Sequence, residues 1–176
     1  VLPTIRSRSR LLRVGVPSKE DALAWLSAQK RLKGDPEVAL AMAGGAPLNA
    51  VKDITGLTLD AKASATLRDL LARGRSLTPD SIVRGYSASM GIPAVALHLS
   101  RWCYDLLRVK SGADPHFFIR EKDVLEKIAA DATMKNLLSL NAAVAEMRRS
   151  AEHPLAPRQV WEGVLLVYVR ALGGQV

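Results

Sequence analysis

Signals that begin and end α-helices recur from residue 18 to the end of the chain, and they restrict the fold more than any other feature. Proline follows Asp35 and Thr78, at the first position of a helix, where its missing amide costs no hydrogen bond. Gly44-Gly45 and Gly74 suit the left-handed residue that closes a helix. Strand patterns are almost absent after residue 16. The sequence therefore predicts an all-α fold beyond the first dozen residues.

The spacing of apolar residues extends this prediction along the chain. It places one helix after Ser18, which has Asp21 three residues on as in a capping box, and others over 35–43, 47–57, 60–73, 78–90, 93–111, 121–130, 133–150 and 158–172. A joint near residues 57–60 divides the helices into two units. The apolar faces predict a core that contains Leu26, Leu32, Leu67, Leu70, Leu71, Ile82, Val83, Tyr86, Leu99, Trp102, Cys103, Leu106, Leu107, Leu125, Ile128, Leu137, Leu140, Val144 and Met147.

The first residues follow another pattern. Residues 1–5 contain no helix signal and lead directly into a cluster of arginines. We interpret them as the end of a β-strand and the loop that leaves it. Because the chain also starts without methionine, we expect it to be the C-terminal part of a longer protein.

Positive charge is concentrated in the same region. Residues 1–34 carry eight basic and two acidic side chains, a net charge of +6, out of +8 for the whole chain. Such an excess indicates an anionic partner, either nucleic acid or a nucleotide phosphate. A solvated basic end explains the charge equally well.

The composition excludes several classes of protein. With 48% hydrophobic residues, 12 Gly and 9 Pro, the chain is neither disordered nor collagen-like. A single cysteine excludes a disulfide framework and indicates a reducing compartment. Arg170 interrupts the last apolar stretch, which is shorter than the roughly 20 residues of a membrane span. We expect a soluble protein.

Residues for catalysis or metal binding are scattered. The sequence contains no G-x-x-x-x-G-K-[ST] phosphate loop. His98, His116 and His153 are isolated from one another, which disfavours a metal site. Cys103 lies in an apolar helical pattern, where a small buried side chain is commoner than a nucleophile. The segment shows no enzyme signature of its own.

Aromatic residues have an ordinary structural interpretation. Trp25, Trp102 and Trp161 each stand at helical spacing from leucines and are predicted to anchor the core. Phe117-Phe118 fall in a predicted loop, and we expect them to pack beneath it rather than to form an interface patch.

The run Leu2-Pro3-Thr4-Ile5-Arg6-Ser7-Arg8-Ser9 is the most informative part of the sequence. An arginine on a tight loop can reach a polyphosphate, because its planar guanidinium donates several hydrogen bonds to anionic oxygens. An arginine supplied across a subunit boundary can stabilise the charge that develops in phosphoryl transfer. Arg10 and Arg13 are weaker candidates for such a role.

Three parts of the sequence together resemble the δ′ (delta-prime) family of clamp-loader subunits of bacterial DNA polymerase III, which are AAA+ proteins. They are this run, Trp25-Leu26, and Ala43-Gly44-Gly45-Ala46-Pro47-Leu48-Asn49-Ala50. In that family the first run contains a Ser-Arg-Cys motif, whose arginine acts in trans on the ATP of the neighbouring subunit. The resemblance assigns this catalytic role, as an arginine finger, to Arg8 together with Ser7. Ser9 stands where the family has cysteine, and we expect the role to survive because the guanidinium performs it.

The second run separates two types within the family. In ATP-binding relatives it places a sensor arginine in a G-S-x-R pattern, and Leu48 stands at that position here. An apolar side chain cannot contact a γ-phosphate. The resemblance therefore favours the non-hydrolysing δ′ type over the ATP-hydrolysing γ/τ type.

The resemblance also implies an architecture. Residues 1–14 would be the last strand and loop of an AAA+ core, residues 15–58 a three-helix lid domain, and residues 59–176 a helical-bundle collar domain for oligomerisation. The chain would be no enzyme by itself and would hold neither a cofactor nor a metal, because neighbouring subunits bind ATP-Mg. Its partners would be γ/τ and δ through the collar, and the β sliding clamp and primed DNA through the complex, in the bacterial cytoplasm.

Two alternatives remain open. One is a γ/τ-type AAA+ ATPase, which a phosphate loop upstream would support. The other is a basic helical module that binds DNA directly, which predicts an affinity that falls with salt.

Overall fold

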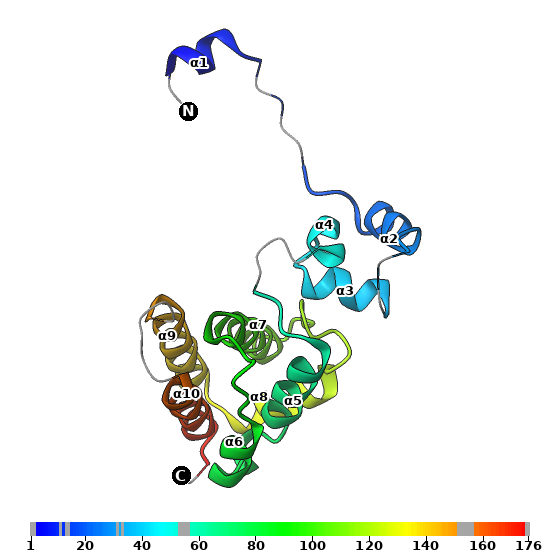
Figure 1. The fold of residues 1–176 in the computed structure, drawn as a ribbon. Helices are drawn as coiled ribbons and strands as arrows, with labels where there is room; N and C mark the ends of the chain where they lie inside the picture. The colour runs from blue at the N-terminus through cyan, green and yellow to red at the C-terminus, as the bar shows by residue number, and fades with distance from the viewer. Residues whose placement is uncertain are drawn as a thin grey trace.

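A computed structural model of the chain describes residues 3–10, 12, 15–30, 32, 34–52, 57–150 and 157–174. These residues form helices and irregular connections, with no β-strand among them, so the all-α prediction is confirmed for this part of the chain. Figure 1 shows three parts: helix α1 at one end, a small group α2–α4, and a larger bundle α5–α10.

Helix α1, Pro3–Arg8, corrects the prediction of a strand end at the start of the chain. A strand needs a neighbouring strand for its N–H and C=O groups, and the described residues contain none. A helix pairs these groups within itself. Ser7 adds a local contact, since its hydroxyl donates to the Thr4 carbonyl at 3.0 Å. Residues 1, 2, 11, 13 and 14, which include Arg13, lie outside the described residues.

The small group consists of α2 (Lys19–Ser27), α3 (Pro36–Met42) and α4 (Pro47–Val51). These helices pack around Ala22, Leu26 and Leu40. The predicted helix starts are confirmed: the Ser18 hydroxyl accepts from the Asp21 amide at 3.1 Å, and Asp35 Oδ1 accepts from the Glu37 amide at 2.9 Å.

The end of α3 also follows the prediction. Gly44 has a φ of +66°, which only glycine adopts without strain. The turn lets the Gly45 amide donate back to the Leu40 carbonyl at 2.9 Å, closing the helix in a Schellman motif. The chain then turns directly into α4.

Two predictions for the small group are wrong. Trp25 does not anchor the core, because 40% of it is exposed. Helix α2 packs mainly against α3 and α4, so its buried stripe is narrow, and Ala22 and Leu26 fill it. Helix α4 ends at Val51 rather than near residue 57. Residues 53–56, in the expected joint, lie outside the described residues.

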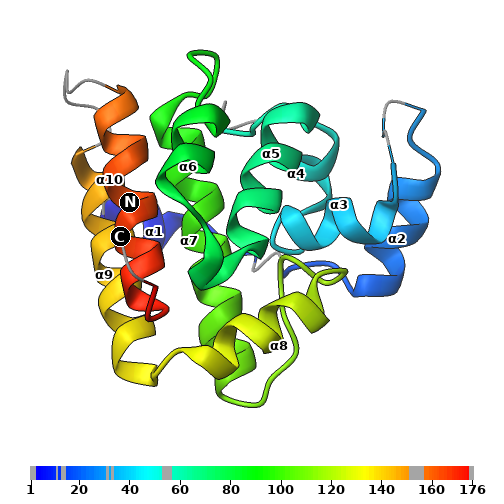
Figure 2. The ribbon, with the colours of Figure 1, turned by 90° about the horizontal axis from the view of Figure 1, so that it is seen from below.

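The bundle consists of α5 (Ala61–Ala72), a 3₁₀ turn (Gly74–Ser76), α6 (Pro79–Gly85), α7 (Ile92–Lys110), α8 (Lys122–Asp131), α9 (Met134–Ser150) and α10 (Pro157–Ala171). Helix α7 lies at its centre and packs against α8, α9 and α10, while α9 and α10 lie side by side (Figure 2). Among the described helices, none combines the length and the apolar character that crossing a membrane requires.

The predicted bundle core is largely confirmed. All the residues proposed for it between 67 and 147 are buried except Val83, Tyr86 and Leu107, and Leu107 is half-buried at the edge of the core. Helix α6 ends at Gly85, short of the expected residue 90, because the backbone becomes extended at Tyr86. The Tyr86 ring then lies 6.3 Å from the Trp161 ring, and Val83 faces solvent.

Three large buried side chains have partners for their polar atoms. Trp102 Nε1 donates to the Tyr168 hydroxyl at 3.2 Å, and that hydroxyl donates to the Leu71 carbonyl at 2.7 Å. Trp161 Nε1 donates to the Ile82 carbonyl at 2.8 Å. These bonds join α5, α6, α7 and α10, and they avoid the cost of burying an unpaired polar group. The prediction that Trp102 and Trp161 anchor the core is confirmed. The domain limits 1–14, 15–58 and 59–176 stay a prediction.

Candidate functional site

Arg8 and Ser7 lie on α1. Arg8 is exposed, and it forms no hydrogen bond or ion pair with another described residue. Ser7 precedes it on the same helix, so the two side chains project about 100° apart. Leu48 is 62% exposed and belongs to α4, a helix that lies away from α1 (Figure 1). The structure therefore does not bring the two sequence runs together.

The small group of helices meets the bundle at the loop 111–121, between α7 and α8. Arg120 donates from Nη2 to Asp35 Oδ2 at 2.6 Å and lies 3.8 Å from Glu37. The hydrogen bond from Arg120 holds the pKa of the Asp35 carboxyl below its usual value. A side chain added at Gly44 would lie 3.6 Å from the Phe117 ring, so the α3–α4 turn also approaches the loop closely.

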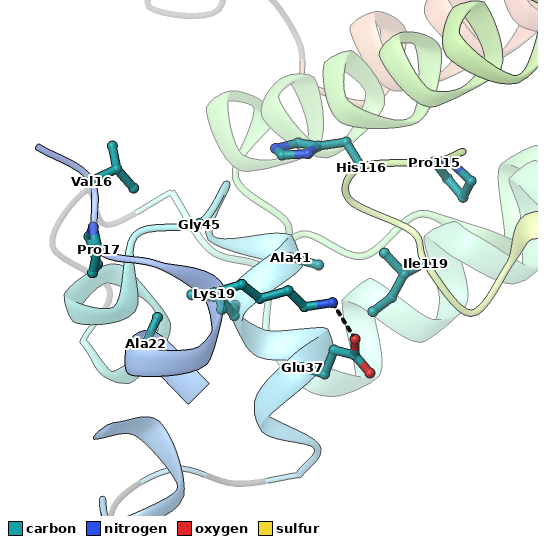
Figure 3. A pocket seen from close by; sticks show the side chains of 11 residues that line it. Val16, Pro17, Lys19, Ala22, Glu37, Ala41, Gly45, Pro115, His116 and Ile119 are labelled. Atoms are coloured by element: carbon teal, nitrogen blue, oxygen red, sulfur yellow. Dashed lines mark hydrogen bonds and ion pairs between the residues drawn. The ribbon is translucent and has the colours of Figure 1, made fainter. Parts of the chain in front are cut away.

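A pocket of about 310 Å³ opens at this junction (Figure 3). We call it the junction pocket; its lining is Val16, Pro17, Lys19, Ala22, Glu37, Leu40, Ala41, Gly45, Pro115, His116 and Ile119. Lys19 Nζ lies 2.6 Å from Glu37 Oε1, so the two charges in the lining offset each other. The remaining lining is apolar except for His116. The junction pocket suits an apolar group better than an anion, and its lining offers no nucleophile paired with a base.

Asp105 fixes the shape of the loop, and the sequence analysis did not select it. Its fully buried carboxylate accepts three backbone amides, from His116 at 2.8 Å, Phe117 at 2.9 Å and Phe118 at 2.7 Å. A buried charge is tolerated only when such partners are supplied. The signal in the sequence was an aspartate on the apolar face of the longest helix, a position that carboxylates rarely occupy without partners.

Rings and arginines gather where this loop meets α7. We call Arg101, Tyr104, Arg108, His116 and Phe117 the aromatic surface. The Tyr104 ring centroid lies 6.2 Å from that of His116 and 5.7 Å from that of Phe117, and the His116 and Phe117 rings are 4.7 Å apart. Arg101 Cζ lies 5.4 Å from the Phe117 ring, and Arg108 Cζ lies 5.8 Å from the Tyr104 ring. No single motif in the sequence marks this cluster.

Phe118 points inward from the same loop. It is 3% exposed, and its ring lies 4.9 Å from Trp102 and 5.1 Å from His98. The expected packing beneath the loop is confirmed for Phe118. Its neighbour Phe117 is only half-buried and belongs to the aromatic surface.

His98 is a buried titratable group on α7. It is 4% exposed, and its Nε2 has no hydrogen-bond partner among the described residues. Burial lowers the pKa of His98 to about 4, and the nearby charges of Arg101 and Arg68 lower it further. The imidazole is therefore neutral near pH 7.

The remaining candidate ligands and nucleophiles do not form a site in the described part of the chain. Cys103 is buried, as predicted, and burial raises the pKa of its thiol to about 12. Such a thiol does not ionise near neutral pH. His153 lies outside the described residues. Among the described side chains, no group of three or more His, Cys, Asp or Glu residues is arranged to hold a metal ion.

The chain matches no protein-family model, and no curated protein shows significant similarity to it. The fold and the junction define an α-helical protein in which a small three-helix group contacts a larger bundle at the loop 111–121.

Proposed function

We propose that the chain belongs to the ring subunits of an AAA+ clamp loader. Within that class, we propose the δ′ type, a non-hydrolysing subunit of the bacterial DNA polymerase III clamp loader. The observation that carries the proposal is the run ending in Ser7-Arg8-Ser9, followed by a three-helix group with the Gly44-Gly45 turn and then by a larger helical bundle.

In this proposal the subunit acts in the bacterial cytoplasm as a member of a ring. The bundle α5–α10 is the collar that assembles with the γ/τ and δ subunits. The ring opens the β sliding clamp with ATP and loads it onto primed DNA. ATP-Mg is bound by the neighbouring subunits, and Arg8 completes one of their sites.

Two observations support this assignment of roles. Arg8 is exposed and forms no hydrogen bond or ion pair with another described residue that would have to break before it reached a neighbour. Leu48, at the position of the sensor arginine in ATP-binding relatives, is an exposed apolar residue on α4. A site with leucine there lacks the cation that would contact a γ-phosphate, which favours the δ′ type over the ATPase alternative.

Arg8→Ala tests the catalytic role. In the full-length subunit, the substitution should leave assembly intact and lower the ATPase rate of the reconstituted loader by about 10³-fold at the site concerned. Arg10→Ala is the matched control, because Arg10 is also an exposed arginine in the same segment. Equal rates for the two variants would refute the role of Arg8.

Co-assembly tests the proposed class. The chain is mixed with γ/τ and δ subunits from the same organism, and the mass is followed by size exclusion with light scattering. A stoichiometric complex is the expected result. If neither this chain nor the full-length protein joins subunits that assemble normally with each other, the proposal is wrong.

A further inference from the structure

One face of α7 combines charge and an aromatic ring. Arg101, Tyr104 and Arg108 stand three and four residues apart, a spacing that places side chains in one row along a helix. The loop that follows α7 brings His116 and Phe117 against this row. Two guanidinium groups and three rings thus share one surface at the end of the bundle that faces the small helical group.

The rings of this surface are available to a ligand. Tyr104 is 44% exposed, His116 is exposed and Phe117 is half-buried. The rings meet edge to face, with interplanar angles of 70°, 74° and 81°, rather than stacked on one another. Arg101 and Arg108 lie over the rings of Phe117 and Tyr104, so each guanidinium already occupies one face of its ring. Isolated exposed rings need no explanation, but three in contact beside two arginines form a distinct patch.

The surface is also held in place before any ligand arrives. Asp105 binds the backbone amides of His116, Phe117 and Phe118, which fixes the loop against α7. These amides offset the buried negative charge of Asp105. Asp114, an exposed acid of the same loop, is paired with Lys122 at 2.7 Å. The surface is therefore rigid and cationic, and a rigid surface loses little entropy on binding.

We propose that the aromatic surface binds single-stranded nucleic acid. Bases stack on the rings of Tyr104 and Phe117, and backbone phosphates contact Arg101 and Arg108. Rings that accept any base, placed beside arginines that follow the backbone, are the general chemistry of such sites. A duplex keeps its bases stacked inside and offers no ring faces along its length, so this surface favours single strands. The inference does not depend on the proposed function, because it concerns contacts made by this chain alone.

Fluorescence anisotropy with a short labelled oligo(dT) tests the proposal on the 176-residue chain. Tyr104→Ala should weaken binding about tenfold, because it removes one stacking contact without changing the charge. Tyr104→Phe, which keeps the ring, should bind like the original sequence. Trp25→Ala is the matched control: it removes another exposed ring, on α2, and should leave the affinity unchanged. Oligo(U) and a DNA duplex in parallel distinguish RNA from DNA and single strands from duplex.

Charge is tested separately. Arg101→Gln should reduce the slope of log affinity against log salt by about 0.7, the contribution of one phosphate contact in a single strand. Circular dichroism checks that each variant is folded. If Tyr104→Ala is unfolded, ultraviolet cross-linking of the original chain to a bromodeoxyuridine oligonucleotide replaces it, and the cross-links should map to Tyr104, His116 or Phe117.

Each result of these experiments either supports or overturns the proposal that the aromatic surface binds single strands. The proposal is supported if Tyr104→Ala loses affinity for oligo(dT) while Tyr104→Phe and Trp25→Ala keep it. Cross-links confined to the aromatic surface support it as well. Undetectable binding to oligo(dT) and oligo(U) overturns it and leaves the surface to a protein partner. The proposal is also overturned if Trp25→Ala loses as much affinity as Tyr104→Ala, if the chain binds duplex more tightly than single strands, or if the cross-links map only outside the aromatic surface.

Discussion

A single buried carboxylate determines the shape of the loop on which both the junction pocket and the aromatic surface depend. Asp105→Asn replaces one oxygen by an NH₂ group, so at least one amide of residues 116–118 faces a donor or loses its charged acceptor. We expect a loss of about 1–3 kcal/mol in the free energy of unfolding. Urea denaturation measures it. Asp114→Asn, at an exposed carboxylate, should change stability much less than Asp105→Asn; similar effects for both variants would contradict this role of Asp105.

His98 should make the free energy of unfolding depend on pH below neutrality. Unfolded, it protonates near its usual pKa of 6.5, whereas in the folded chain its pKa is about 4. Between these values the unfolded state binds more protons, so stability falls as the pH falls from about 6.5 to 4. Below pH 4 the loss is complete, and this group adds no further pH dependence. The full effect is about 3 kcal/mol. His98→Leu should flatten the curve of unfolding free energy against pH in this window; an unchanged slope would assign the dependence to other groups.

At the scale of elements, the same substitution should have opposite effects at two glycines. Gly112 ends α7 with a φ of +82°, and Gly163 lies inside α10 with ordinary helical geometry; a methyl group would meet no atom at either position. Gly112→Ala should cost about 1–2 kcal/mol, because a side chain disfavours the left-handed conformation. Gly163→Ala should stabilise by about 0.5–1 kcal/mol through helix propensity. Melting temperatures that shift in the same direction would contradict this reasoning.

At the scale of the whole molecule, the two groups of helices should open separately. Among the described residues of the small group, Ala22, Leu26 and Leu40 form the buried core, whereas the bundle has a large continuous core. We expect hydrogen exchange, followed by mass spectrometry, to be faster in α2–α4 than in α7, α9 and α10. Arg120→Ala, which removes the ion pair at the junction, should accelerate exchange in α2–α4 by up to about fivefold. Arg84→Ala, which removes an exposed pair within α6, should not; uniform exchange over the chain would argue for one cooperative unit.

Much of the local structure was predictable. Ser18, Asp35 and Thr78 begin helices because their side chains accept amides of the first turn, which is a property of a few neighbouring residues. Leu67 and Leu71 are buried because the apolar stripe of a helix has to leave water. The candidate site could be predicted less well from the sequence. The roles of Ser7 and Arg8 come from a resemblance and stay a prediction.

The sequence by itself determined which segments are helical, how most of them begin and end, and which faces are buried, because these depend on contacts within a few turns. The tertiary structure alone decided the rest. Trp25 is exposed because α2 packs mainly against two short helices, which leave its outer side in water. The helix over residues 3–8 replaces the expected strand because no described segment pairs with it. Tyr104, His116 and Phe117 form one surface only because Asp105 folds the following loop back onto α7, and contacts between separate segments leave no period in a sequence.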